Sequence, residues 1–327
     1  MSYAGVIREV VRREPGMRDI DVDDSRRLFG AMLDGGIPEF ELGALLAGLA
    51  IRGESHHELL GFYHALSERL HRLTPPDGEV RPVVLPAYGG ARHQPNLTPL
   101  IAMLLQRVGV PVVVHGTLEG VGRVATAYVL RELGVLPSAT LTQAQAALDR
   151  DKIAFVPTAV LAPGLSNLLA LRARFGTRAT PHVIAKLIEP FGGAGLRVIC
   201  SMHDQCLANL HQLLLATGER ALLMRGTEGE PFADPHKRPR IELFDDGRAE
   251  ILFERESAIM DGLAGLRPPT DARGTAAYIR KMLDGHAPMP LPIINQLACC
   301  LYASGFTADF NQAKAIAAVQ THSLAAA

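Results

Sequence analysis

The chain has 327 residues, of which 48% are hydrophobic and 20% charged, and it carries 33 lysines and arginines against 34 acids. These values exclude a basic histone-like tail, a disordered polymer and a small disulfide-stabilised protein. Because the net charge is −1, any binding of a polyanion must come from local segregation of charge.

Cysteines and histidines are too sparse for a disulfide framework or a metal site. The four cysteines, Cys200, Cys206, Cys299 and Cys300, match neither disulfide spacing nor paired zinc knuckles, and the histidine pairs lack further ligands at a usable spacing. The N-terminus lacks the apolar core of a signal peptide, and no uncharged apolar run approaches the roughly 18 residues that cross a bilayer. We therefore expect a cytoplasmic protein with no metal and no membrane partner.

The first 73 residues predict four short amphipathic helices. Asp21 is a candidate cap of the second helix, Pro38 a candidate first residue of the third, and Ser55 precedes the fourth. The segment LTPPDG, residues 73–78, then marks a linker into a different architecture.

From Val80 onward, β-branched runs alternate with helical patterns, which is typical of a mostly parallel sheet covered by helices on both faces. The predicted strands are Pro82–Leu85, Val110–Val114, Lys152–Val156, Leu196–Cys200 and Ala221–Met224. The predicted helices are Leu97–Val108, Val121–Leu133, Asp204–Leu215, Thr270–Leu283 and Pro292–Ser304. Residues 163–189 hold two helical patterns without a strand, which indicates a return to the small domain. The expected fold is α/β, with a discontinuous small helical domain (1–73 and about 163–190) and a large domain (78–160 and about 193–323).

A glycine-rich loop, Tyr88-Gly89-Gly90-Ala91-Arg92, lies between the first predicted strand and a helix. Backbone amides and a helix N-terminus in this setting can hold phosphate. A tight strand-to-helix turn that needs glycine is the other interpretation.

Further motifs follow the loop in a recognisable order: Asn96-Leu97-Thr98, then VVVHG ending in His115-Gly116, then AYVLRELG. Their order and spacing resemble the anthranilate phosphoribosyltransferase family, of the glycosyltransferase family 3 type, whose pattern runs GTGGD, NIST, KHGN and ADVLEALG. Residues 163–178 and 224–229 extend the resemblance. It implies a nucleoside phosphorylase-like architecture and a homodimer formed through the small domain.

The chain departs from that family where phosphoribosyl diphosphate and magnesium are held. Ala91 stands in place of an aspartate, Val114 of a lysine and Thr117 of an asparagine, and Glu230-Pro231-Phe232 leaves at most one carboxylate at the paired acidic metal site. We therefore expect no catalytic residue, and magnesium and phosphoribosyl diphosphate only if the chain is a transferase after all. The residues that retain the family's scaffold form a vestigial phosphate site: Gly89, Gly90, Arg92, Asn96, Thr98, His115, Gly116 and Arg225.

Positive charge is concentrated in two basic segments, residues 163–197 and residues 236–240. Between residues 242 and 261, by contrast, there are seven acids and only two basic residues, Arg248 and Arg255. Arginine reaches phosphate oxygens with two donors, so such segregation suits a phosphate-backbone contact. An ordinary solvated helix face, or the parent enzyme's anion pocket, is the other interpretation. The candidate nucleic-acid contacts are Arg172, Arg174, Arg178, His182, Lys186, Arg197, Lys237, Arg238 and Arg240.

A closer resemblance joins the chain to a DNA-binding, non-catalytic branch of the family, through the RGTEGEP turn at Arg225–Pro231 and the loop Tyr88–Pro99. The absence of tryptophan and the 5% aromatic content argue against base-stacking platforms, so sequence-independent binding is expected. The predicted function is DNA binding by a homodimer with a degraded active site. The alternatives are a phosphoribosyl or other glycosyl transferase of altered specificity, and a scaffold that binds another protein through its helical face.

Overall fold

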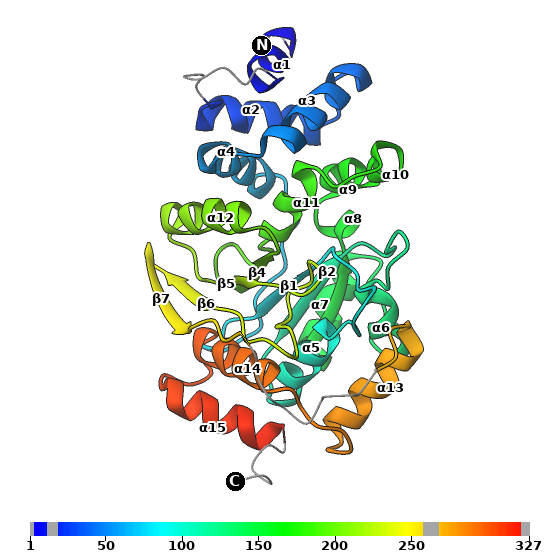
Figure 1. Ribbon diagram of the computed structural model, residues 1–327, viewed down its shortest axis with the longest axis vertical. Helices are drawn as coiled ribbons and strands as arrows, with labels where there is room; N and C mark the ends of the chain where they lie inside the picture. The colour runs from blue at the N-terminus through cyan, green and yellow to red at the C-terminus, as the bar shows by residue number, and fades with distance from the viewer. Residues whose placement is uncertain (1–2, 12–18, 258–267, 322–327) are drawn as a thin grey trace.

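The computed structural model describes residues 3–11, 19–257 and 268–321. Figure 1 shows an elongated molecule with the N-terminal helices at one end, a sheet in the middle and the C-terminal helices at the other end. In the described part of the chain, no helix is both long and apolar enough to cross a membrane.

Four helices form the N-terminal end: α1 (Tyr3–Val11), α2 (Val22–Leu33), α3 (Glu39–Arg52) and α4 (His56–Ser67). The predicted caps are confirmed for α2, where the Asp21 side chain accepts a hydrogen bond from the amide of Asp24, and for α4. Ser55 and Glu58 form a complete capping box there, which satisfies two backbone donors that a helix start leaves free. Pro38 is the N-cap of α3 rather than its first helical residue.

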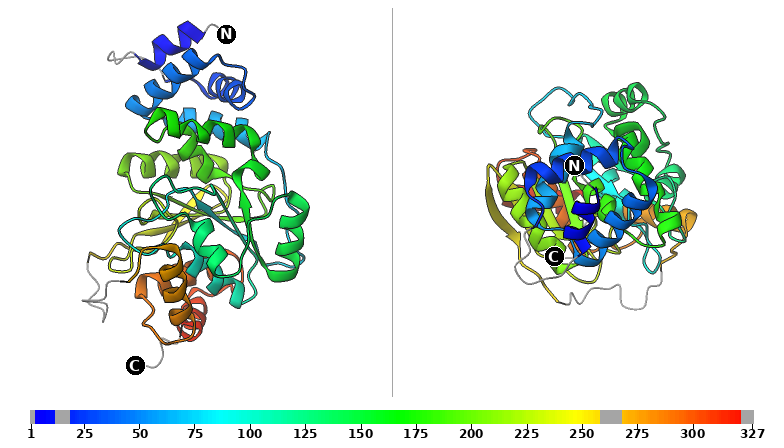
Figure 2. Two further views of the ribbon diagram at one scale, coloured as in Figure 1. Left: turned by 90° about the vertical axis from the view of Figure 1, so that its right-hand side faces the viewer. Right: turned by 90° about the horizontal axis from the view of Figure 1, so that it is seen from above.

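The chain returns to these helices after the third strand. The returning helices are α8 (Thr158–Leu161), α9 (Pro163–Ala170), α10 (Arg172–Phe175), α11 (Thr180–Ile184) and the 3-10 turn η1 (Ala185–Leu187). α9 packs against α2, and α11 packs against α3 and α4, so the green helices of Figure 2 lie directly beneath the blue ones. The exact domain limits stay a prediction.

A seven-stranded sheet carries the rest of the chain, in the order β3-β2-β1-β4-β5-β6-β7. The strands are β1 (Val83–Ala87), β2 (Val112–Gly116), β3 (Ile153–Pro157), β4 (Leu196–Ser201), β5 (Ala221–Arg225), β6 (Ile241–Asp245) and β7 (Arg248–Phe253). The first five are parallel and the last two antiparallel. The predicted fold class is confirmed, and the hairpin of β6 and β7 was not predicted.

Helices cover both faces of the sheet. α7 (Leu141–Asp151) and α12 (Asp204–Thr217) share a core with the N-terminal helices on one face. The other face packs against α5 (Thr98–Arg107), α6 (Thr126–Glu132), α13 (Ala272–Leu283), α14 (Leu291–Ala303) and α15 (Phe310–Gln320). The carboxyl ends of the parallel strands lie at the junction with the helical end, since Tyr88 after β1 and Ser201 of β4 line one cavity with Gly53 and Glu54. In open α/β sheets, ligands bind at the carboxyl ends of the strands.

Candidate functional site

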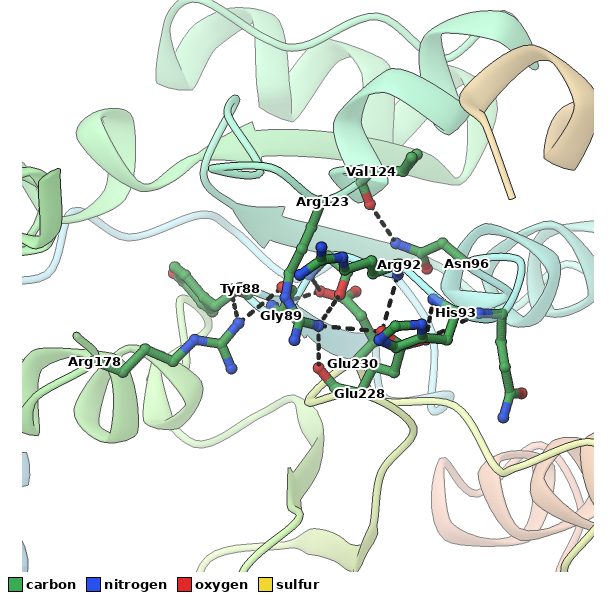
Figure 3. A network of polar contacts seen from close by, with 12 residues as sticks. Tyr88, Gly89, Arg92, His93, Asn96, Arg123, Val124, Arg178, Glu228 and Glu230 are labelled. Atoms are coloured by element: carbon green, nitrogen blue, oxygen red, sulfur yellow. Dashed lines mark hydrogen bonds and ion pairs between the residues drawn. The ribbon is translucent and has the colours of Figure 1, made fainter. Parts of the chain in front are cut away.

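The glycine-rich loop after β1 surrounds a carboxylate of the chain itself. The amides of Gly89 and Gly90 donate to Oε1 of Glu230 at 2.6 and 2.7 Å. Its Oε2 accepts from the hydroxyls of Thr98 and Thr126 at 3.0 and 2.6 Å. Glu230 has no exposed surface, so these four donors enclose a fully buried carboxylate. Figure 3 shows Glu230 beside Gly89 and Glu228.

A second carboxylate, Glu228, occupies the remainder of the loop. It accepts from the amides of Arg92, His93 and Gln94 at 2.9, 2.8 and 2.9 Å. Arg123 pairs with it at 3.2 Å, and only 11% of the Glu228 side chain is exposed. Two glutamates from the turn after β5 thus accept hydrogen bonds from the amides that a phosphate would need as donors.

Close backbone contact makes this arrangement possible. A Cβ atom on Gly89 would lie 2.7 Å from the carbonyl carbon of Gly229 and 2.8 Å from the carbonyl oxygen of Glu228, so only glycine fits. The amide of Ala91 donates to the carbonyl of Val124 at 3.0 Å. Every backbone amide from residue 89 to residue 94 therefore donates to a partner within the chain.

The other scaffold residues are built into the structure around the loop. Asn96 donates to the hydroxyl of Thr126 at 2.9 Å, and the amide of Thr98 donates back to Asn96. A Cβ atom on Gly116 would lie 1.9 Å from the carbonyl oxygen of Ala87. These contacts support the strand ends, and phosphate binding by these residues stays a prediction.

His115 is fully buried at the end of β2. The hydroxyl of Tyr88 and Nδ1 of His115 share a hydrogen bond of 2.9 Å, and Thr158 donates to Tyr88 at 3.0 Å. Burial lowers the pKa of His115 to about 3, so this histidine is neutral at pH 7 and presents no charge to an anion.

Two members of the predicted phosphate site lie outside it. Arg92 is exposed, and only its backbone joins the loop. Arg225, at the end of β5, donates to the carbonyl of Met202 and pairs with Asp204, each at 2.5 Å. Neither guanidinium reaches the buried carboxylate of Glu230.

The loop donors are taken by Glu228 and Glu230, and both oxygens of Glu230 face hydrogen-bond donors. Among the residues that the structure describes, no group of three or more histidine, cysteine or acidic side chains could hold a metal ion.

Basic side chains converge beside the loop, at the junction of the helical end and the sheet. Arg178 donates to the carbonyl of Gly89 at 2.8 Å, and Lys186 donates to the carbonyl of Cys200 at 2.9 Å. The side chain of Arg172 has no hydrogen-bond or ion-pair partner within the described residues. Burial lowers the pKa of Arg178, and Arg172 and Arg123 lower it further.

Two cavities open between these side chains, one of about 340 Å³ lined by Arg172 and one of about 380 Å³ lined by Arg178 and Lys186. His182 lines both. Burial, then Arg178 and Arg172, lowers the pKa of His182 to about 4. Contrary to its expected place among the cations, His182 is therefore neutral at pH 7.

The prediction that Arg197 contacts nucleic acid is wrong, because this side chain is fully buried. It pairs with Glu219 at 2.5 Å, donates to the carbonyl of Leu187 at 3.1 Å and lies over the ring of Tyr63. The alternation of side chains along β4 turns Arg197 toward the helical end, where it joins α4 to the sheet.

Arg174 is 70% exposed and pairs with Glu39 at 3.2 Å. It lies on the outer edge of the junction, on α10. A surface pair of this kind contributes little to stability, so Arg174 can exchange its partner for a phosphate.

The second basic segment lines a separate cavity of about 490 Å³, between α12 and the strands β5 and β6. Two of its predicted contacts are already paired, Arg238 with Glu256 and Arg240 with Glu242, both at 3.1 Å. Lys237 is exposed, with no side-chain partner among the described residues.

Two further cations were missed by the sequence analysis. Arg255 lines the same cavity as Lys237 and is exposed, although the acids around it in the sequence suggest that its charge is compensated. Arg123 pairs with Glu228 beside Arg172 and Arg178. No signal in the sequence points to Arg255, because the hairpin of β6 and β7 that brings it back to the start of β6 was not predicted.

Comparison with known proteins places this geometry in context. Residues 5–69 match the helical bundle domain of the glycosyl transferase family. The uncharacterized protein YbiB of Escherichia coli (strain K12) is 40% identical over 312 residues, which cover 95% of this chain and 97% of YbiB. An anthranilate phosphoribosyltransferase of Methylocella silvestris is 26% identical over 301 residues, 90% of this chain and 85% of its own.

Solved structures share the fold. Anthranilate phosphoribosyltransferase from Thermus thermophilus superposes with a TM-score of 0.77 at 23% identity, over 97% of this chain and 94% of its own. The enzyme from Saccharomyces cerevisiae, in complex with PRPP and Mg, superposes with a TM-score of 0.71 at 12% identity, over 98% and 93%.

Proposed function

This chain belongs to the anthranilate phosphoribosyltransferase-like family, and we propose that it is a member that binds nucleic acid, DNA above all, instead of transferring a phosphoribosyl group. In this proposal it acts in the cytoplasm as a homodimer joined through its helical end. It contacts the sugar-phosphate backbone and reads no sequence.

The observation that carries the proposal is the state of three half-buried cations at the junction. Among the described residues, the Arg172 side chain has no partner, while Arg178 and Lys186 bond only to backbone carbonyls. Glu54, which lines the cavity of Arg178 and Lys186, accepts from Thr180 at 2.6 Å, and burial raises its pKa. Glu119 lines the cavity of Arg172, and within the described residues it forms no ion pair with that guanidinium. Cations that lack carboxylate partners favour an external anion with several charges.

The filled glycine-rich loop supports the same proposal from the other side. Phosphoribosyl transfer depends on clamping diphosphate with cations and preorganised donors. Here Glu228 and Glu230 hold those donors and add negative charge where diphosphate would lie. An extended polyanion can use the neighbouring cations without entering the loop.

Charge reversal of Arg172 and Arg174 together tests the proposal. The measurement is fluorescence anisotropy of a labelled oligonucleotide, and Arg172→Glu with Arg174→Glu is expected to weaken binding about tenfold or more. Arg150→Glu is the matched control, because Arg150 is 75% exposed and, like Arg174, pairs with one carboxylate. Undiminished binding by the folded double variant would contradict the placement of the site.

Calorimetry separates nucleic-acid binding from the transferase alternative. The filled loop predicts no heat on titrating millimolar phosphoribosyl diphosphate with magnesium into the protein. A saturable heat would favour a transferase of altered specificity.

A further inference from the structure

Three cavities follow one another across the carboxyl edge of the sheet. The first lies at the ends of β2 and β3, at Gly116 and Pro157. The second lies at the ends of β1 and β4, at Tyr88 and Ser201, and the third at the end of β5, at Arg225. The strand order β3-β2-β1-β4-β5 places them in a row.

The first two cavities share lining residues, and the first turn of α12 separates the second from the third. Tyr88 and His182 line both the first and the second. The second and third flank the first turn of α12, with Cys206 on one side and Asp204 and Leu207 on the other. The three therefore form one interrupted trough, which we call the edge trough.

Each part of the edge trough carries a cation that can bind an external phosphate. Arg172 lines the first cavity, Arg178 and Lys186 the second, and Lys237 and Arg255 the third. The third holds five basic side chains, counted without its histidine, against three carboxylates. The first cavity also holds one carboxylate, Glu119, and the second one, Glu54. Each of the three nevertheless keeps at least one cation that has no carboxylate partner among the described residues.

From this trough we infer that the nucleic acid bound is single-stranded, an inference that rests on the proposed function. Arg172, Arg178 and Lys186 are half-buried, and a duplex, whose phosphates lie on a rigid cylinder, cannot bring its backbone down to them. A single strand bends at every nucleotide. Volumes of about 340, 380 and 490 Å³ are also of the size that holds a small ligand such as one nucleoside.

The lining fits a strand whose bases are not read. Tyr88 is 5% exposed and its ring packs against His115, so it offers no stacking platform. The exposed side chains of Leu118 and Val121 in the first cavity and of Met202 in the second supply apolar contacts instead. Such contacts accept any base, which agrees with sequence-independent binding.

The test compares one oligonucleotide of about 20 nucleotides, labelled and single-stranded, with the same sequence as a blunt duplex. Anisotropy at low salt is expected to give at least tenfold tighter binding of the single strand. Equal or tighter binding of the duplex would overturn the inference and leave the proposed function intact. Binding of neither would overturn the proposed function itself.

Two single variants test whether the strand follows the whole trough. Arg172→Glu changes the first cavity and Arg255→Glu the third, and each is expected to reduce the slope of log K against log salt by about 0.7 for a single strand. Arg150→Glu is the control and should leave the slope unchanged. An effect of Arg172→Glu without one of Arg255→Glu, in folded variants, would overturn the continuous path.

Discussion

At the scale of single residues, four hydrogen bonds converge on the carboxylate of Glu230, from two amides and two hydroxyls. The donors have the geometry of an anion site, and the anion is supplied by a side chain of the chain itself. In the proposed function, these donors bind this internal carboxylate and no external phosphate.

Replacement of Glu230 by alanine is expected to expose this capacity. The variant leaves four buried donors without an acceptor and should lose at least about 1–3 kcal/mol of unfolding free energy. Millimolar phosphate is expected to bind the vacated donors and raise the Tm of the variant but not of the wild type. Thermal unfolding with and without phosphate measures this.

Glu250→Ala provides the control, since Glu250 is exposed on β7. Its Tm should respond to phosphate no more than that of the wild type. An equal response of Glu230→Ala and Glu250→Ala, or no response of either, would contradict the assignment of the loop as a filled anion site.

His182 makes stability depend on pH in a definite direction. Its folded pKa is about 4, while an unfolded histidine titrates near 6.5. Between these values the unfolded chain binds more protons, so stability falls as pH drops from about 6.5 toward 4. His182→Gln is expected to lose less stability than the wild type between about pH 7 and pH 5, as measured by urea unfolding. An identical loss in both proteins would refute it.

At the scale of elements, the decisive contact joins the loop after β1 to the turn after β5. The two backbones are in contact at Gly89 and Gly229. Glu228, the residue before Gly229, adopts a positive φ of 53°. That unusual backbone costs free energy and is held by the hydrogen bonds of its side chain.

Gly89→Ala is expected to separate these two elements. Its Cβ would meet rigid backbone at 2.7 Å, so a loss of about 1–3 kcal/mol of unfolding free energy is expected. Gly43→Ala is the control, because nothing lies within 4 Å of a Cβ there, inside α3, and alanine should stabilise the helix by about 0.5–1 kcal/mol. Denaturant unfolding of both variants measures the contrast, and equal effects would contradict the close contact.

The five parallel strands could be predicted from the sequence because each is buried over nearly its whole length and reads as a short apolar run, β-branched at Val112–Gly116 and leucine-rich at Ala221–Arg225. β7 could not be predicted, because most of its residues are exposed and it contains the charged residues Arg248 and Glu250. α7 was missed because its buried face consists only of Ala144 and Leu148.

The glycine-rich loop and the basic segments of the candidate site could also be found in the sequence, but their partners could not. Glu230 lies 141 positions from Gly89, and nothing local to the loop announces it. For Arg197 the prediction failed because a count of charges along the chain does not show which side chains are buried. Every residue of β4, Arg197 included, is buried.

At the scale of the whole molecule, a net charge of −1 conceals an uneven distribution. Cations without a carboxylate partner among the described residues, such as Arg172, Lys237 and Arg255, line the edge trough. On the antiparallel side of the sheet, acids pair with arginines, as Asp245 does with Arg220. Polyanion binding by such a molecule must be local and sensitive to salt.

Nucleic-acid binding is tested most directly by the fluorescence anisotropy of a labelled single-stranded oligonucleotide with the wild-type protein at two salt concentrations. The proposed function predicts submicromolar binding at low salt and a steep fall in affinity on adding salt, by about 0.7 in log K per log unit of salt for each phosphate contacted. Absence of binding at low salt, or an affinity that salt leaves unchanged, would contradict it.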